Sequence, residues 1–338
     1  MPITSDGSGG TVRSLVATRS SGYDRRRGSG APRSAVIRVA RRGIAKGKGV
    51  MVMHDQIVCL SIAGSDPSGG AGIQADLKTF AALGVYGAAA ITALTAQNTT
   101  GVQGVDLIDP AFVAQQAESV FDDLPVAAVK TGMLGTVAII DAVADVIEMA
   151  RDRFPTLLVV VDPVMVARGG DPLLDPQAVM RLRDRLLPLA NLVTPNRHEA
   201  SLLTGSGPIE TAEDLRRVAT SLFELVDRRP VLVKGGQVLR GALDLLIDAN
   251  GSEFPLTIAG APITTRSTHG SGCTLAAAIT ALLARGHSLR DACSAAKQFV
   301  FGAIEHAPRL GRGHGPLNHL WLSRIEEQAG GRTSYEGG

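Results

Sequence analysis

Residues 57–83, IVCLSIAGSDPSGGAGIQADLKTFAAL, decide the fold. The stretch begins with an apolar run of the buried-strand kind over 57–63, and a Gly-rich turn separates that run from a helical pattern over 73–83. Short apolar runs and amphipathic stretches continue to alternate as far as residue 306. This alternation predicts an α/β fold with a mostly parallel central sheet and helices on both faces.

The same patterns place the other elements. Further strands are expected over 88–94, 126–130, 157–161, 192–194 and 231–234, and a β-pair over 242–247 and 254–258 with a turn at Asn250-Gly251. Helices are expected over 112–121, 137–150, 176–187, 212–226, 273–284 and 289–306, and Pro195 and Asn196 open one more. Ligands of such sheets bind outside the carboxyl ends of the strands, so the loops that follow the strands are the candidate site.

Composition limits the classes of function. Of the 338 residues, 45% are hydrophobic and 20% charged, as in a globular protein with a sizeable core. Aromatic residues are only 4%, which argues against a base-stacking surface. Residues 1–50 carry eleven Lys and Arg against two acids, whereas the remaining residues carry 23 against 30. The mildly acidic body has no general attraction for phosphate backbones, so no nucleic-acid partner is expected.

The basic extension is set apart from the rest of the chain. Residues 1–52, rich in Ser, Gly and Arg, are predicted to be disordered, 53–325 to form the folded domain and 326–338 to be a flexible tail. An Arg- and Ser-rich, acid-poor composition is also typical of an organelle transit peptide. We favour an over-extended gene start, with Met51 or Met53 as the true beginning, because the ordered pattern starts a few residues later. A cytoplasmic location is therefore expected, with organelle targeting as the alternative.

Three kinds of feature are not expected. The charge-free stretch 79–105 contains Gln97, Asn98 and several Thr and Gly, which predicts a strand and a loop rather than a membrane span. The three cysteines have no CxxC spacing, which excludes a disulfide scaffold and a cysteine-based zinc site and favours a reducing compartment. His198-Glu199 does not complete HExxH because position 202 is leucine, so His198 is expected at the surface.

The first candidate loop is the Gly-rich turn over 63–72, which matches neither GxGxxG nor GxxxxGK[ST]. Its glycines let the backbone approach a ligand, and Asp76 follows in the next helix. Gln97 comes after the next strand, where its amide offers a donor and an acceptor that suit an uncharged heterocycle. A tight connection and a turn cap are the ordinary alternatives for these two features.

Charged residues follow three later strands. Asp162 ends the apolar run 157–161, where a carboxylate can hold Mg²⁺ through water or act as a turn-starting residue before Pro163. Asn196 and Glu199 have places near a metal and phosphates, or act as ordinary helix caps. Lys234 beside two glycines can meet a phosphate as a point charge, or be an exposed lysine of a hairpin.

The strongest signal is THGSGCT at 268–274, followed by an apolar helix. Its glycines expose consecutive backbone N–H groups at a helix N-terminus, which makes a pocket for anions and for charge developing on a transferring phosphoryl group. Cys273 at this helix end is expected to have a lowered pKa, so that it can act as a base or a polar neighbour. A Gly-rich helix start with a buried cysteine is the ordinary alternative.

Taken together, these loops resemble those of the hydroxymethylpyrimidine/phosphomethylpyrimidine kinases of thiamine biosynthesis, in the ribokinase-like superfamily. The resemblance covers about residues 57–320 and rests on seven motifs in the family's order. They are AGSDPSGGAGIQADLKTF (63–80), ITALTAQNT (91–99), KTGML (130–134), VDPVM (161–165), TPNRHEA (194–200), VKGG (233–236) and THGSGCT (268–274). The resemblance implies a ribokinase-like three-layer sandwich, ATP and Mg²⁺ as cofactors, a pyrimidine alcohol as substrate and a homodimer. Pyridoxal kinase of the same branch and a non-catalytic nucleotide-binding protein are the alternatives.

The resemblance also implies roles for twelve residues. Substrate-binding residues would be Gln97, Gly64, Asp76 and Val164; ATP and phosphate would be bound by Lys234, Asn196 and Ser271; Asp162 and Glu199 would serve the metal; Gly270, Gly272 and Cys273 would form the catalytic anion hole. Cys273 stands where related sugar kinases have an aspartate base, which leaves the identity of the base open. Ser271 replaces the usual Thr, Arg168 a frequent Lys and Gln237 a common His.

Overall fold

The computed structural model describes residues 56–165, 174, 176–236, 242–258 and 263–323. All of them belong to one unit of the chain, Lys48–Gly338. The described residues do not include the predicted extension 1–52, the predicted tail 326–338 or the substituted positions Arg168 and Gln237. No helix within the described ranges is long and apolar enough to cross a membrane.

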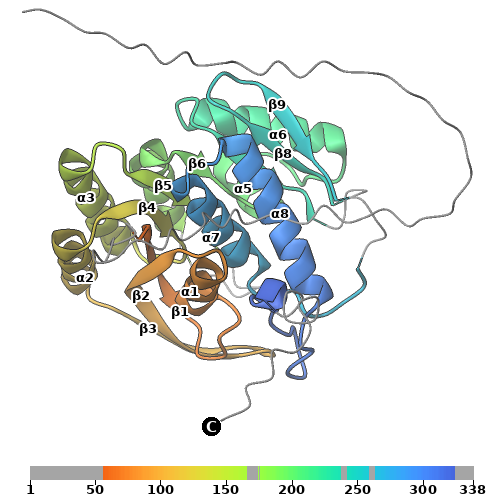
Figure 1. Ribbon diagram of the computed structural model, residues 1–338. Helices are drawn as coiled ribbons and strands as arrows, with labels where there is room; N and C mark the ends of the chain where they lie inside the picture. Colours follow the sequence, from red (N-terminus) through yellow and green to blue (C-terminus); the bar gives the residue numbers. More distant parts are fainter. Residues whose placement is uncertain (1–55, 166–173, 175, 237–241, 259–262, 324–338) are drawn as a thin grey trace, which may run out of the picture. The chain divides into compact units, whose positions relative to one another are not determined.

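A sheet of nine strands forms the centre of the fold, in the order β3-β2-β1-β4-β5-β6-β7-β8-β9 (Figure 1). The strands are β1 (Val58–Ser65), β2 (Tyr86–Asn98), β3 (Gly101–Leu107), β4 (Val126–Thr131), β5 (Leu158–Val161), β6 (Leu192–Val193), β7 (Val231–Lys234), β8 (Asp244–Ile247) and β9 (Glu253–Leu256). The six neighbouring strands β2, β1, β4, β5, β6 and β7 pair in parallel. At the edges, β3 pairs antiparallel with β2, β8 antiparallel with β7, and β9 antiparallel with β8. The predicted mostly parallel sheet is confirmed.

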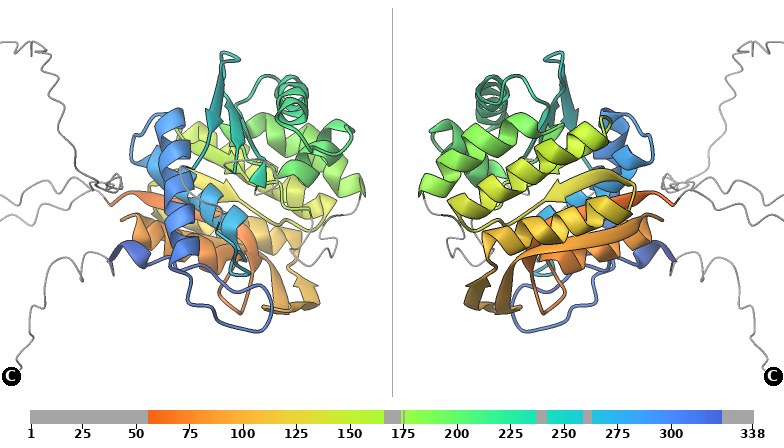
Figure 2. Two further views of the ribbon diagram at one scale, coloured as in Figure 1. Left: turned by 90° about the vertical axis from the view of Figure 1, so that its right-hand side faces the viewer. Right: turned by 90° about the vertical axis from the view of Figure 1, so that its left-hand side faces the viewer.

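Helices cover both faces of this sheet (Figure 2). They are α1 (Gly72–Ala82), α2 (Pro110–Asp123), α3 (Val137–Arg153), α4 (Pro176–Arg181), α5 (Arg197–Thr204), α6 (Ala212–Leu225), α7 (Ser271–Ala284) and α8 (Leu289–Glu305). One buried cluster joins the sheet to α1, α7 and α8, and another joins the opposite face to α2 through α6. The protein is therefore a three-layer α/β sandwich, as expected.

The strands read as continuous apolar runs because both of their faces are buried. In β5, Val159 and Val161 pack into the cluster with α2 and α3, while Val160 between them packs into the cluster with α7 and α8. In β1, Cys59 faces α7 and its neighbours Val58 and Leu60 face the other way. The two-residue period of a strand thus supplies apolar side chains to both helical layers at once.

Two predicted stretches differ from the structure. The strand predicted over 88–94 continues to Asn98, and β3 (Gly101–Leu107), which was not predicted, pairs with its end. Gln97 is therefore part of a strand and lies opposite Val102 rather than in a turn after the strand. The helix predicted over 176–187 is α-helical only to Arg181, after which Leu182–Leu186 forms a π-turn.

The strand order fixes where a ligand can bind. After β1 the chain forms β2 on one side, and it later returns to place β4 on the other side of β1. Loops that leave neighbouring strands in opposite directions open a crevice at the carboxyl ends of those strands. The loops after β1, β2 and β4 are thereby brought next to those after β5, β6 and β7.

Candidate active site

A cavity of about 360 Å³ lies at the carboxyl ends of the parallel strands. Its volume is within the range of small-molecule sites. The predicted residues among those that line it are Gly64, Gln97, Asp162, Val164, Asn196, Glu199, Lys234, Gly270, Ser271, Gly272 and Cys273. The structure therefore brings together the ends of six strands and the start of α7, with Gln97, Asp162 and Cys273 around a single cavity.

The start of α7 forms one wall of the cavity. Gly270, the N-cap residue, has a φ of 78°, which favours glycine, and a Cβ atom there would collide with the carbonyl oxygen of Gly70. Thr274 N donates to Gly270 O at 2.8 Å. The N–H groups of Gly272 and Cys273 come before this bond and have no acceptor within the helix. They are thus available to an anion in the cavity, where the helix dipole adds to their attraction.

An ion pair lies beneath this wall. Lys234 Nζ is 2.9 Å from Asp162 Oδ1, which also accepts a hydrogen bond from Thr194 Oγ1 at 3.2 Å. Burial alone would lower the pKa of Lys234, but the carboxylates of Asp162 and Glu199 outweigh it and raise that pKa. A Cβ atom on Gly272 would lie 3.5 Å from Lys234 Nζ and 3.8 Å from Asp162 Oδ2. The absence of a side chain at Gly272 therefore leaves the ion pair open to the cavity.

Glu199 and Asn196 form a capping box at the start of α5. Asn196 accepts a hydrogen bond from Glu199 N at 3.0 Å, and Glu199 Oε2 accepts one from Asn196 N at 2.7 Å. Burial raises the pKa of Glu199 to about 7. The cation of Lys234 lowers this pKa, whereas the negative charge of Asp162 raises it further. The capping prediction is confirmed, and the same carboxylate also lines the cavity. His198 beside it is exposed, as expected.

Lys130 is a site residue that we did not single out. Its ammonium group lines the cavity floor, although the side chain is fully buried, and it lies 2.8 Å from Asp76 Oδ2. Burial alone would lower the pKa of Lys130, but the carboxylate of Asp76 outweighs it and raises that pKa. The only available signal was a lysine at the end of an apolar strand, in KTGML.

The position of Asp76 corrects one predicted role. Its carboxylate is fully buried, bonds to Ser61 Oγ at 2.6 Å and to Lys130, and is not part of the cavity lining. A direct contact between Asp76 and a substrate ring is therefore not supported. In this structure Asp76 affects the cavity through Lys130, because it neutralises the cation that lies at the floor.

The expectation of a lowered pKa at Cys273 is wrong. Burial raises the pKa of this thiol to about 11, against the opposing effects of the Lys130 cation and the Gly72 backbone. The carboxylates of Asp76 and Asp162 add to the rise. Desolvation of a thiolate is thus larger than the stabilisation that Lys130 and the Gly72 backbone provide, which predicts a neutral thiol at physiological pH.

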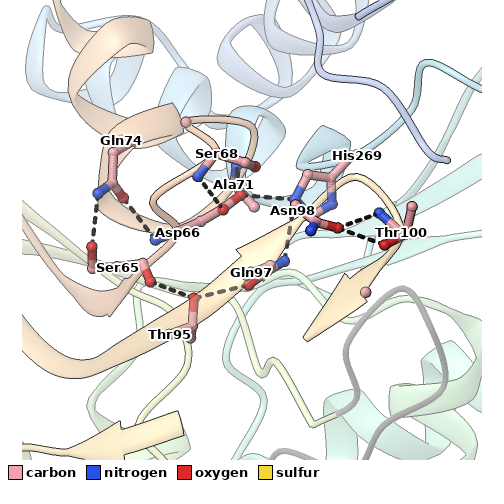
Figure 3. A network of polar contacts seen from close by, with 12 residues as sticks. Ser65, Asp66, Ser68, Ala71, Gln74, Thr95, Gln97, Asn98, Thr100 and His269 are labelled. Carbon is pink, nitrogen blue, oxygen red and sulfur yellow. Dashed lines mark hydrogen bonds and ion pairs between the residues drawn. The ribbon is translucent and has the colours of Figure 1, made fainter. Parts of the chain in front are cut away.

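The opposite wall carries Gln97 on β2 (Figure 3). One end of its carboxamide lies 3.2 Å from Thr95 Oγ1 and the other lies 3.3 Å from His269 Nε2. His269 Nε2 is also 2.8 Å from Asp66 Oδ2. His269, Asp66 and Thr95 all line the cavity, and sequence reasoning assigned none of them a role. His269 stood inside THGSGCT, where only the glycines and the cysteine carried a recognised signal.

A family model described as phosphomethylpyrimidine kinase matches residues 66–318. The chain belongs to the phosphomethylpyrimidine kinase family. A hydroxymethylpyrimidine/phosphomethylpyrimidine kinase of Haemophilus influenzae is 46% identical over 271 residues, covering 79% of this chain and 97% of that one. A thiamine biosynthesis bifunctional protein of Geobacter sulfurreducens is 51% identical over 262 residues, 77% of this chain but only 52% of that one. The chain thus spans about half of the bifunctional relative.

Solved structures agree with this membership. A pyridoxal kinase of Bacillus subtilis in complex with ADP is 40% identical, with a TM-score of 0.72 and coverage of 79% of this chain and 99% of that one. A phosphomethylpyrimidine kinase of Clostridium difficile is also 40% identical, with a TM-score of 0.62 and coverage of 74% and 100%. The expected ribokinase-like fold of this phosphomethylpyrimidine kinase family member is confirmed.

Removing the buried cation tests the cavity floor. Lys130→Met leaves the carboxylate of Asp76 buried and unpaired, and we expect it to lower the free energy of unfolding by about 3–5 kcal/mol. Arg216→Met, which breaks the exposed Arg216–Glu253 pair, is the control and should cost about 1 kcal/mol or less. Urea denaturation measures both. The loss in Lys130→Met should shrink as the pH falls, because protonation of Asp76 removes the uncompensated charge; equal losses in both variants would contradict this account.

The raised pKa of Cys273 predicts slow alkylation. At pH 7 its thiolate fraction should be about a hundredfold below that of an ordinary cysteine, because its pKa is about 11 rather than the reference value of 9.0. Mass spectrometry of the native protein after timed iodoacetamide treatment should show a Cys273 rate that rises about tenfold per pH unit up to pH 10. Buried Cys59 and Cys293 are internal controls and should react more slowly still. If the alkylation rate of Cys273 instead reached a plateau between pH 7 and 8, the helix N-terminus would lower the pKa of the thiol by more than burial raises it.

Proposed function

We propose that this protein transfers the γ-phosphoryl group of ATP to the hydroxymethyl group of 4-amino-5-hydroxymethyl-2-methylpyrimidine, and then phosphorylates the monophosphate, for thiamine biosynthesis. The observation that carries the proposal is the single cavity, with the Gln97 amide on one wall and the free N–H groups of α7 on the other. The match to two relatives that are named for both activities covers 97% of the length of each relative. Similar pyridoxal kinases were solved with ADP and with AMP-PCP, which supports ATP as the phosphate donor.

The two walls divide the work of the reaction. Gln97 holds the ring, so that the hydroxyl oxygen faces the γ-phosphorus. That oxygen forms the new bond while the bond from the γ-phosphorus to the bridging oxygen breaks and ADP leaves. The N–H groups of Gly272 and Cys273 stabilise the charge on the transferring group, and Lys234 adds a point charge. Phosphoryl transfer needs this positioning and charge stabilisation more than covalent chemistry.

The hydroxyl proton does not require a thiolate at Cys273. The transition state of phosphoryl transfer is loose, so the attacking oxygen loses its proton late, to an oxygen of the transferred phosphoryl group or to water, and gains little from a strong base. A thiol with a pKa of about 11 remains protonated before the reaction. Cys273 therefore acts here as a neutral, polarisable neighbour of the phosphoryl group whose backbone N–H supplies the stronger interaction.

The carboxylates near the phosphate side fit Mg²⁺. Asp162 receives its hydrogen bonds on Oδ1, and Oδ2 is the oxygen nearest to Gly272 at the cavity. Within the described ranges no group of three or more His, Cys, Asp or Glu is arranged to hold a metal by itself. One or two carboxylates are the usual protein share of a Mg²⁺ site that is completed by phosphate oxygens and water. Asp162 and Glu199 would hold the ion, which would supply positive charge against the negative charge that develops on the phosphates.

The assembly and location remain predictions. A homodimer is consistent with β3, the strand at one edge of the sheet, where the side chains of Val105 and Leu107 are exposed. A cytoplasmic location stays our expectation, and the chloroplastic relatives of rice and Arabidopsis are compatible with the organelle alternative. No nucleic-acid partner is proposed.

Pyridoxal phosphorylation is the second candidate. The pyridoxal kinases of Bacillus subtilis and Staphylococcus aureus share the fold with TM-scores of 0.72 and 0.70 and with 40% and 37% identity. Pyridoxal also carries a hydroxymethyl group on a nitrogen heterocycle, so the phosphate wall would serve both reactions. The polar wall at Gln97 favours a ring that offers adjacent donor and acceptor groups, which is why we rank the aminopyrimidine first.

A coupled ADP-release assay on the full chain tests the ranking. We expect kcat/KM for the hydroxymethylpyrimidine to exceed that for pyridoxal by about tenfold or more, since the better polar match at one site is worth at least about 1.4 kcal/mol. The monophosphate should also release ADP. Equal kcat/KM values for pyridoxal and the pyrimidine would overturn the ranking, and no release with any of the three would support the non-catalytic alternative.

Gly272→Val tests the phosphate wall. The added methyl groups would fill the space in front of Lys234 and Asp162, and we expect kcat/KM for ATP to fall by about 100-fold or more. Gly207→Val is the matched control, because no atom lies within 4 Å of a Cβ there and its φ is ordinary. The pyrimidine KM should change little in either variant. An unchanged kcat/KM for ATP in Gly272→Val would remove α7 from the phosphate site.

A further inference from the structure

His269 joins the two walls of the cavity, and the proposed reaction gives it no role. The residue lies just before α7, and its side chain is almost fully buried. Its backbone N donates to Gly315 O at 3.1 Å, which fixes the ring between the loop at 315 and the turn at Gly70. The ring nitrogen Nε2 faces Asp66 and Gln97 together (Figure 3).

The Asp66 contact determines the protonation of Nε2. A carboxylate only accepts hydrogen bonds, and the pKa of Asp66 is lowered because bonds from His269 and Ser68 outweigh the effect of burial. At 2.8 Å from Asp66 Oδ2, Nε2 must therefore carry a hydrogen and donate it. An Nε2 atom that donates has no lone pair left in the ring plane. The Gln97 atom 3.3 Å from it is therefore the carboxamide oxygen, which accepts the same hydrogen as the longer branch of a three-centre bond, because the NH₂ group would place a donor against a donor.

The Thr95 contact leads to the same assignment from the other end of the amide. Thr95 Oγ1 has one hydrogen and donates it to Ser65 O at 2.9 Å. With its hydrogen on Ser65 O, Thr95 Oγ1 offers its lone pairs to the amide, which favours the NH₂ group at the end of Gln97 that lies near Thr95. In Figure 3 the amide nitrogen points at His269, and a half-turn about the last side-chain torsion satisfies both neighbours with the same heavy-atom positions.

We propose that His269, held by Asp66, is a positioning residue that fixes the direction of the Gln97 carboxamide and so selects the polarity of the substrate edge. This inference rests on the proposed function. With the oxygen toward His269 and the nitrogen toward Thr95, one N–H and one oxygen lone pair of Gln97 remain in a fixed order. An aminopyrimidine edge, with a ring nitrogen that accepts beside an amino group that donates, matches that order.

The 4-oxo analogue of the substrate presents the opposite edge, a ring N–H that donates beside a carbonyl that accepts. A freely rotating amide would turn over and bind either edge. An amide that His269 and Thr95 hold in one direction must face the 4-oxo edge donor to donor and acceptor to acceptor, which leaves buried polar groups unpaired. The selectivity between 4-amino and 4-oxo substrates therefore reports the restraint on Gln97.

The test compares kcat/KM for the 4-amino and 4-oxo hydroxymethylpyrimidines by ADP release. The wild type should prefer the 4-amino compound by about 100-fold or more, and a ratio below about ten would overturn the proposal. His269→Phe removes the N–H donor, and we expect the ratio to fall to below about one tenth of the wild-type value, with KM for ATP changed by less than about twofold. His269→Gln, which can donate to both Asp66 and Gln97, should restore the ratio.

A second histidine separates positioning from packing. His319 is also buried and bonds to Thr274 Oγ1 at 3.0 Å, but it does not line the cavity. His319→Phe should leave the substrate ratio unchanged even if it lowers stability. A His269→Phe variant that loses activity equally with both compounds, at an unchanged ratio, would show a merely structural role and overturn the inference.

A measurement on the wild type covers the case in which His269→Phe does not fold. In ¹⁵N-histidine-labelled protein, with His269→Gln used to identify the signal, long-range NMR correlations should show the Nε2–H tautomer at His269. The Nδ1–H tautomer would overturn the inference. Absence of ADP release with the 4-amino compound would instead be a failure of the proposed function, so the two outcomes are distinguishable.

Discussion

The site depends on a close backbone contact between two loops that are two hundred residues apart in the chain. Gly70, in the turn after β1, lies so near to Gly270, at the start of α7, that a side chain at Gly270 would overlap its carbonyl group. The hydrogen bond from His269 to Asp66 joins the same two loops. β1 lies at the switch point of the sheet, and α7 packs across β1, β4 and β5. The contact between Gly70 and Gly270 therefore fixes the direction in which the free N–H groups of α7 face.

The attraction for phosphate that we propose for this site comes from oriented backbone more than from net charge. Lys130 and Lys234 are both cations beneath α7, yet each is matched by a buried carboxylate, Asp76 or Asp162. An unmatched buried charge would cost several kcal/mol, so these pairs keep the floor near neutrality. The N–H groups at the start of α7 are fixed partial charges that need no counter-ion, so a mildly acidic domain could hold a triphosphate there as proposed.

Local pattern predicted the sheet and the gathering of the Gly-rich start of α7 with the strand ends at one cavity, and it failed where tertiary burial decides. The continuous apolar runs at β1 and β5 were sufficient because strands buried on both faces leave that pattern. β3 was missed because its side chains are largely exposed and only its partner β2 defines it. The pKa of Cys273 was predicted in the wrong direction because desolvation, which no spacing encodes, outweighs the lowering effects of Lys130 and the Gly72 backbone. His269 and Lys130 became recognisable only through their partners, Asp66 and Asp76.

The arrangement separates two tasks on different parts of the chain. The proposed phosphate wall is made by α7 and by the ends of β5, β6 and β7, whereas the proposed ring wall is made by β1 and β2. Kinases of pyridoxal and of phosphomethylpyrimidine share this fold at 40% identity with the present chain. A fixed phosphate wall can serve any hydroxymethyl group that reaches it, so the choice of ring must depend on a few side chains opposite. Gln97 is one of them, and the His269 contact makes its direction depend on the same loop that holds the phosphate.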